Sequence, residues 1–162
     1  MNKTYMLPVK QQELARQLSR NSGRIYSKVV SKIFDIHNRK DFWLKKNNME
    51  KYIKLYADNI KLHSQTKQGI VQQYYTALDS YFKALKNHDN PKPPYKRRKY
   101  NKVMFKKSAI KLKDNGLRIS NGRGAKPLWI ETSKLNQRPK YAELIYHSDK
   151  DKYFLHVVVE VK

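Results

Sequence analysis

Three prolines, Pro91, Pro93 and Pro94, divide this 162-residue chain into two parts with different apolar periodicity. Proline lacks a backbone N–H and clashes with the preceding helical turn, so no helix is expected to continue through this segment. Before the prolines, apolar residues recur at intervals of three and four, which is typical of amphipathic helices; after them, apolar and polar residues alternate, which is typical of strands. The sequence therefore predicts an α+β fold.

The part before the prolines predicts several helices. Helical spacing starts at Gln11, and Asn21–Gly23 is expected to interrupt it before an amphipathic helix over 25–37. Another helix is expected over 49–60. A last one runs from Ser64, whose hydroxyl suits an N-cap, to about residue 85.

The remaining segments predict strands. A short strand over 4–7 opens the chain, and Asn115-Gly116 between apolar runs predicts a hairpin, because both residues tolerate positive φ. Further strands are expected at 128–130, 141–146 and 153–161. Together they predict a small curled antiparallel sheet or barrel.

Charge indicates the class of partner. The chain carries 36 Lys+Arg against 13 Asp+Glu, a formal net charge of +23. Such an excess repels itself in a compact state and is usually neutralised by an anionic partner, so nucleic acid, an anionic membrane and an acidic protein are the candidates. An aromatic content of 12% argues against disorder.

Several classes of protein are disfavoured. Cysteine is absent, which rules out disulfides and thiolate zinc sites within the chain. There is no apolar run long enough for a membrane span and no signal-peptide core at the N-terminus, so we expect a cytoplasmic protein. No phosphate loop, nucleophile elbow or convergent carboxylate set is present, so no catalytic residue, metal ligand or cofactor is predicted.

The segment from Lys92 to Lys113 is the most informative. It holds ten Lys and Arg residues, interleaved aromatic residues and no acidic residue. Cations neutralise phosphates while aromatic rings stack on bases, so this segment predicts nucleic-acid binding; a solvated basic loop is the alternative. The predicted contacts are Tyr95, Lys96, Arg97, Arg98, Lys99, Tyr100, Lys102, Lys106 and Lys107.

Two other places are candidates. Lys67, Gln68 and Gln72 lie near the start of the helix from Ser64, where Gln can pair with adenine and Lys can reach guanine or phosphate. A solvated helix face explains them equally well. Arg123 lies in the loop 121–124, whose backbone N–H groups could cradle a phosphate, although a simple turn is the plainer interpretation.

Four stretches of the sequence occur together in one order. They are Lys3 to Gln12; Ser64-Gln65-x-x-Gln68 with Ala77, Tyr81 and Phe82; Pro94 to Lys113 with Leu117-Arg118-Ile119; and Lys152 to Glu160. In this order they resemble the N-terminal half of the TnpB (OrfB) family of transposon-encoded proteins, to which compact type V CRISPR effectors are related.

The resemblance implies a fold and a function. The fold would be an oligonucleotide-binding-like antiparallel β-barrel, the wedge domain (1–10 and 95–162), with a helical recognition domain (11–94) inserted after the first strand. These domains would hold a guide RNA and read a short motif in double-stranded DNA beside the target. The positions implied for the DNA motif are Tyr52, Lys67, Gln68 and Gln72, with Lys102-Val103-Met104 where the family often has Ser-Phe-Thr.

The family's nuclease domain has no counterpart in these 162 residues. Its acidic triad and Cys-x-x-Cys pairs, and therefore its Mg and Zn, would lie beyond Lys162. The ending directly after a strand predicts a truncated, split or shortened protein. We therefore expect that the chain does not cut DNA alone, and a separate nuclease chain is a further candidate partner.

Two other functions remain open at this point. The chain could be a stand-alone DNA-binding regulator or a partner subunit, or it could be a basic RNA-binding structural protein. A membrane partner is disfavoured, because the basic residues lie on a proline-broken connector rather than along one amphipathic helix.

Overall fold

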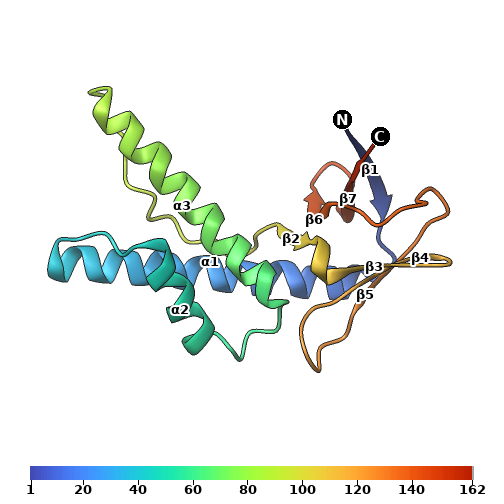
Figure 1. The fold of residues 1–162 in the computed structure, drawn as a ribbon. Helices are drawn as coiled ribbons and strands as arrows, with labels where there is room; N and C mark the ends of the chain where they lie inside the picture. The colour runs from blue at the N-terminus through green and yellow to red at the C-terminus, as the bar shows by residue number, and fades with distance from the viewer. Residues whose placement is uncertain (162) are drawn as a thin grey trace.

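The computed structural model describes residues 1–161 and combines three α-helices with two antiparallel sheets (Figure 1). The α+β class is confirmed, and the helices follow the first strand as predicted. In chain order the elements are β1 (Asn2–Pro8), α1 (Gln12–Lys40), α2 (Lys46–Tyr56), α3 (Ser64–Lys86), β2 (Val103–Lys106), the 3₁₀ turn η1 (Lys107–Ala109), β3 (Ile110–Lys113), β4 (Gly116–Ile119), β5 (Leu128–Glu131), β6 (Tyr141–His147) and β7 (Lys152–Glu160).

The larger sheet has four strands in the order β1-β7-β6-β2. It joins the two ends of the chain, because Asn2 pairs with Glu160, and the two termini lie side by side in Figure 1. Its inward residues, including Leu7, Phe105 and Leu155, are fully buried. Three of its strands, β1, β6 and β7, were predicted from the sequence, whereas β2 was not.

The smaller sheet has three strands in the order β3-β4-β5. The predicted hairpin joins β3 to β4, and Gly116 adopts φ +151°. A Cβ on Gly116 would lie 1.9 Å from the carbonyl oxygen of Ile130, so only glycine fits there. The strand pairing gives two sheets, and no ladder within residues 1–161 closes them into one barrel.

Helix α1 runs without a break through Asn21–Gly23, so the predicted interruption there is wrong. Ser19, Ser22 and Gly23 are all buried, because the segment Arg98–Lys102 packs directly on this face. The small residues allow the backbone of a distant segment to approach closely.

Two other helix limits differ from the prediction. Helix α2 ends at Tyr56, and Ile60 is buried in the loop that follows rather than in the helix. Helix α3 begins at Ser64, but the cap is His63, whose Nδ1 accepts a hydrogen bond from the Gln65 N–H at 3.2 Å. An imidazole nitrogen can satisfy a free backbone N–H as a hydroxyl does.

Two glutamines at the start of α1 attach this helix to both sheets. The Gln12 side chain accepts from the Tyr153 N–H at 2.8 Å and donates to its carbonyl at 3.0 Å, which continues the pairing of β1 with β7 one residue beyond Phe154. The Gln11 side chain accepts from the Trp129 N–H on β5 at 2.7 Å. Figure 1 shows this end of α1 against the sheets, while its other end extends away with α2 and α3.

The two glycines inside helices give a matched pair of variants. A Cβ on Gly23 would lie 2.2 Å from the carbonyl oxygen of Lys99, whereas a Cβ on Gly69 would meet nothing within 4 Å. We expect Gly23→Ala to lower the free energy of unfolding by about 1–3 kcal/mol through overpacking. Gly69→Ala should raise it by about 0.5–1 kcal/mol, because alanine favours helix.

Urea unfolding followed by circular dichroism measures both changes. Equal effects of the two substitutions would contradict the close packing of the 98–102 segment on α1.

Candidate nucleic-acid interface

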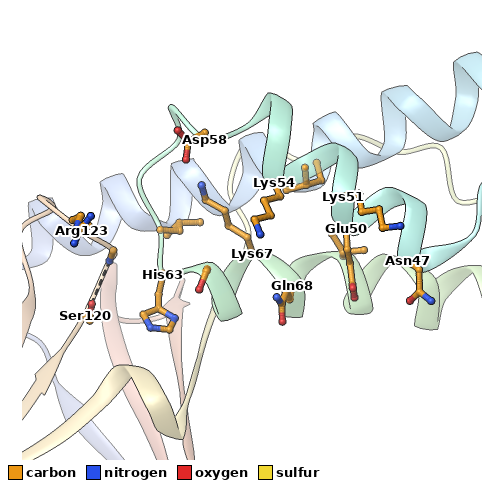
Figure 2. Close-up of a pocket in the computed structure, with 15 residues that line it drawn as sticks. Asn47, Glu50, Lys51, Lys54, Asp58, His63, Lys67, Gln68, Ser120 and Arg123 are labelled. Carbon is orange, nitrogen blue, oxygen red and sulfur yellow. Dashed lines mark hydrogen bonds between the residues drawn. The ribbon is translucent and has the colours of Figure 1, made fainter.

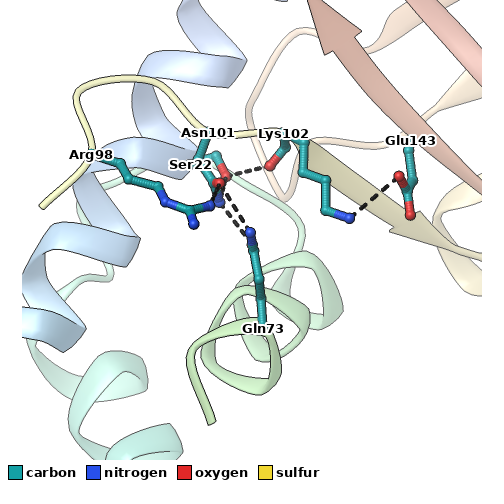
Figure 3. Close-up of polar contacts among 6 residues, drawn as sticks. All are labelled: Ser22, Gln73, Arg98, Asn101, Lys102 and Glu143. Carbon is teal, nitrogen blue, oxygen red and sulfur yellow. Dashed lines mark hydrogen bonds and ion pairs between the residues drawn. The ribbon is translucent and has the colours of Figure 1, made fainter. Parts of the chain in front are cut away.

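The buried residue Asn101 joins the basic connector (residues 92–102) to two helices (Figure 3). Its backbone N–H donates to the carbonyl of Ser19 at 3.1 Å, and its carbonyl accepts from the Ser19 hydroxyl at 3.0 Å. Its side-chain amide donates to Gln73 on α3 at 2.9 Å and to Ser22 on α1 at 3.1 Å. The connector is therefore fixed rather than loosely solvated.

The neighbours of Asn101 reinforce this attachment. The Arg98 guanidinium donates to the Asn101 side chain at 2.9 Å and lies 4.3 Å above the ring of Tyr26. The Lys102 carbonyl accepts from Ser22 at 2.7 Å, and its ammonium lies 3.5 Å from Glu143 on β6. Arg98 and Lys102 therefore hold the connector in place as well as adding charge.

A first basic surface, which we call the connector–α1 surface, lies where the connector crosses α1. It is an open hollow lined by cations from both segments and by one aromatic residue of α2, and no acidic residue lines it. Its charged and aromatic members are Arg20, Arg24, Lys28, Tyr52, Arg97, Arg98 and Lys99.

Contacts within this surface set the positions of its side chains. The ammonium groups of Lys28 and Lys32 lie 5.9 and 4.7 Å from the centroid of the Tyr52 ring. Arg20 donates to the Lys99 carbonyl at 3.0 Å. Arg24 and Arg97 are exposed, so both guanidinium groups are accessible from solvent.

A second basic surface, the α2–α3 groove, is a cavity of ≈ 870 Å³ between α2, the start of α3 and the loop after β4 (Figure 2). Its cations come from these three segments and are accompanied by two carboxylates. The charged and amide members are Asn47, Glu50, Lys51, Lys54, Asp58, Lys67, Gln68 and Arg123.

Lys67 is the most constrained cation of the groove. Its ammonium donates to the Ala57 carbonyl at 2.9 Å. Burial lowers its pKa below the ordinary value, an effect that the nearby Asp58 partly opposes. A desolvated ammonium of this kind gains more from an incoming anion than an exposed one does.

The structure divides the residues predicted on the helices between these two surfaces. Tyr52 lies in the connector–α1 surface, whereas Lys67, Gln68 and Arg123 come together in the α2–α3 groove. Gln72 lies in the lining of neither, and its side chain accepts from Lys46 at 2.7 Å.

Tyr95 is engaged in packing. Its ring lies 5.1 Å from Phe34 and 6.3 Å from Trp43, and its hydroxyl is 3.2 Å from His37 Nδ1. Burial raises its pKa above the ordinary value. The structure thus gives Tyr95 a packing role, which the interleaved basic pattern did not indicate.

The other connector residues lie at the surface or on β2. Lys96 is exposed, and Tyr100 is exposed beside Arg16, whose hydrogen bond lowers the pKa of the Tyr100 hydroxyl. Met104 is half-buried on β2 opposite Glu143. Lys106 and Lys107 are exposed where β2 meets η1.

The prediction omitted several basic residues of these surfaces. Arg20, Arg24 and Lys28 follow at intervals of four along α1, a spacing that puts them on one helix face. That spacing can be read in the sequence. The contribution of Lys51 and Lys54 cannot be read there, because it depends on how α2 lies beside α3.

Comparison with known proteins leaves the family open. No protein-family model matches the chain, and no curated protein matches its sequence. The resemblance to the TnpB family therefore stays a prediction.

Within residues 1–161, none of the helices is both long and apolar enough to cross a bilayer. In the same described range, no three His, Asp or Glu side chains lie close enough together to share a metal ion.

The His63 cap predicts a pH-dependent stability. Burial lowers the pKa of His63 below its ordinary 6.5, and protonation would remove the acceptor that binds the Gln65 N–H. Its stabilising effect is therefore complete above pH 6.5 and is lost as the pH falls through the lower, folded-state pKa. We expect His63→Asn to keep the cap, because Asn also caps helices, and to lose part of this dependence.

Urea unfolding of both proteins between about pH 7 and 5 measures the effect. Burial also lowers the pKa of His156, but this residue is present in both proteins, so the difference between them isolates His63. Identical pH dependence of wild type and variant would contradict the assignment.

Proposed function

We propose that the chain is a nucleic-acid-binding module of the TnpB type, which binds a structured guide RNA and a short motif in double-stranded DNA. The observation that carries the proposal is the connector–α1 surface, where Arg and Lys from two distant segments converge with no carboxylate among the lining residues. Such a surface matches a polyphosphate backbone, because each cation that meets a phosphate releases a counterion.

The two surfaces suit different parts of a nucleic acid. The connector–α1 surface offers cations in an open hollow, which suits backbone phosphates. The α2–α3 groove combines Lys67 and Gln68 with the carboxylates of Glu50 and Asp58. Amide, ammonium and carboxylate groups together can distinguish base edges, so in this proposal the groove reads the DNA motif.

The arrangement of the elements supports the family resemblance. Three helices follow β1, and both sheets contribute to one continuous core. In this proposal the two sheets correspond to the oligonucleotide-binding-like wedge barrel and the helices correspond to the recognition domain. Metal-dependent cleavage would be supplied by an acidic site outside these 162 residues.

Salt dependence tests the electrostatic part of the proposal. A protein that makes about 10 phosphate contacts should show a slope near −9 when the logarithm of its affinity for duplex DNA is plotted against the logarithm of salt concentration. A slope shallower than about −3 would contradict a dominant role for the basic surfaces.

A matched pair of double variants locates the contacts. Arg24→Ala with Arg97→Ala removes two exposed cations of the connector–α1 surface, and Lys134→Ala with Lys140→Ala removes two exposed cations between β5 and β6. We expect the first pair to make the slope shallower by about 1.8 and the second to leave it unchanged. An equal change in both would show that the charge acts without a defined surface.

RNA recovery tests the guide. The chain is expressed together with the DNA that flanks its gene, purified at moderate salt, and the bound RNA is sequenced. One dominant RNA from that flanking DNA is the expected result. A random sample of cellular RNA would contradict guide binding and leave a general nucleic-acid-binding protein.

A further inference from the structure

Strand register in the smaller sheet aligns two cations with an exposed tryptophan. Lys111 on β3 pairs with Arg118 on β4, and Arg118 pairs with Trp129 on β5. The residues on either side of this row, Ile119 and Ile130 among them, are buried in the core, except Leu112, which is partly buried against it. Because side chains alternate across a sheet, the Lys111–Arg118–Trp129 row lies on the outer face.

Trp129 is unusually accessible for its type. It is 46% exposed, whereas tryptophan in folded proteins is highly buried on average. Trp129 also lines an open hollow of ≈ 640 Å³ together with Gly116 and the charged residues Lys113, Asp114 and Glu131. Gly116 has no side chain and lies diagonally across the ladder from Trp129, so the surface beside the indole is open.

The strand that carries Trp129 is held firmly. Its backbone N–H donates to the Gln11 side chain at 2.7 Å. Two residues further along, the Glu131 carboxylate pairs with the Lys10 ammonium at 2.5 Å. The indole is therefore presented from a backbone that is anchored at Trp129, and the Glu131 carboxylate already has a cationic partner.

Three cations, Lys111, Lys113 and Arg118, and two carboxylates, Asp114 and Glu131, surround Trp129, and Glu131 is paired with Lys10. Lys111, Lys113 and Arg118 take part in no ion pair within residues 1–161. An exposed aromatic ring with unpaired cations beside it is complementary to an unpaired nucleotide, whose base stacks while its phosphates meet the cations. A base inside a duplex has both faces covered and cannot use such a ring.

We infer that the outer face of β3-β4-β5 is a stacking platform for an unpaired base of single-stranded nucleic acid. Trp129 stacks on the base, and Lys111 and Arg118 contact the flanking phosphates. This inference rests on the proposed function and adds to it a site for single strands, separate from the two basic surfaces. Oligonucleotide-binding sheets use their outer faces in a comparable way.

Tryptophan fluorescence reports on this platform directly. The chain has two tryptophans, so Trp43→Phe leaves Trp129 as the only one, and excitation at a wavelength that the 12 tyrosines absorb little isolates its emission. The variant is titrated with an unstructured eight-nucleotide RNA and with the same sequence as a duplex, and circular dichroism checks its fold. We expect the single strand to quench the emission in step with binding measured by anisotropy, and the duplex to leave it nearly unchanged.

The affinities of substituted variants for the single strand and the duplex complete the test. Trp129→Ala should weaken binding of the single strand by about 5- to 150-fold and change duplex affinity by less than about twofold. Trp129→Phe should keep most of the affinity. Tyr146→Ala is the control, because Tyr146 has the same 46% exposure on the other sheet and should have no effect.

The outcomes separate the two proposals. If the wild-type chain binds duplex with a steep salt dependence but Trp129→Ala binds the single strand as tightly as wild type, the platform is overturned and the proposed function stands. Unchanged Trp129 emission at saturation has the same meaning. If the wild-type chain binds neither form, both proposals are overturned.

Discussion

The buried side chain of Asn101 is the interaction on which the rest of the surface depends. Its amide and backbone groups are hydrogen-bonded to Ser19, Ser22 and Gln73, so burying them costs little, whereas leaving them unpaired would cost about 1–3 kcal/mol each. Because these partners lie on α1 and α3, the connector has one position relative to both helices. That position brings Arg97 and Lys99 beside the cations of α1.

Cations held this close repel one another, and few have acidic partners. Within residues 1–161, Lys10, Arg39 and Lys102 are the only Lys or Arg side chains in ion pairs with carboxylates. The shared apolar core and the hydrogen bonds of Asn101 offset this repulsion in the free protein. An anionic ligand that binds the folded chain would relieve the repulsion and stabilise the fold by mass action. In the proposed function, the charge that destabilises the free chain is therefore also the source of its affinity for nucleic acid.

Local patterns in the sequence predicted most of the elements. Apolar periodicity gave the helices and strands, and Asn115-Gly116 gave the hairpin between β3 and β4. The error at Asn21–Gly23 has a long-range cause. Small polar residues resemble a helix end in the sequence, but here they are covered by a segment about 80 residues further along. The His63 cap was missed for a different reason, since a histidine rarely accepts at this position.

Only part of the candidate site could be predicted from the sequence. Composition and the run of cations from Lys96 to Lys99 predict a nucleic-acid partner, but they did not predict the division into two surfaces. Tyr95 and Tyr100 look equivalent in the sequence, yet one packs on Trp43 and the other is exposed. Trp129 became a candidate only when the register of β4 and β5 placed Arg118 beside it. Each of these distinctions depends on contacts between distant segments.

Ultraviolet cross-linking of the chain to bound RNA, followed by mass spectrometry of the linked peptides, locates the residues that contact RNA. We expect cross-links in the peptides that carry Tyr52 and Arg97–Lys99, because these residues line the connector–α1 surface. Cross-links confined to the outer face of the four-stranded sheet, at Met6 or Phe154, would contradict a role for this surface in binding RNA.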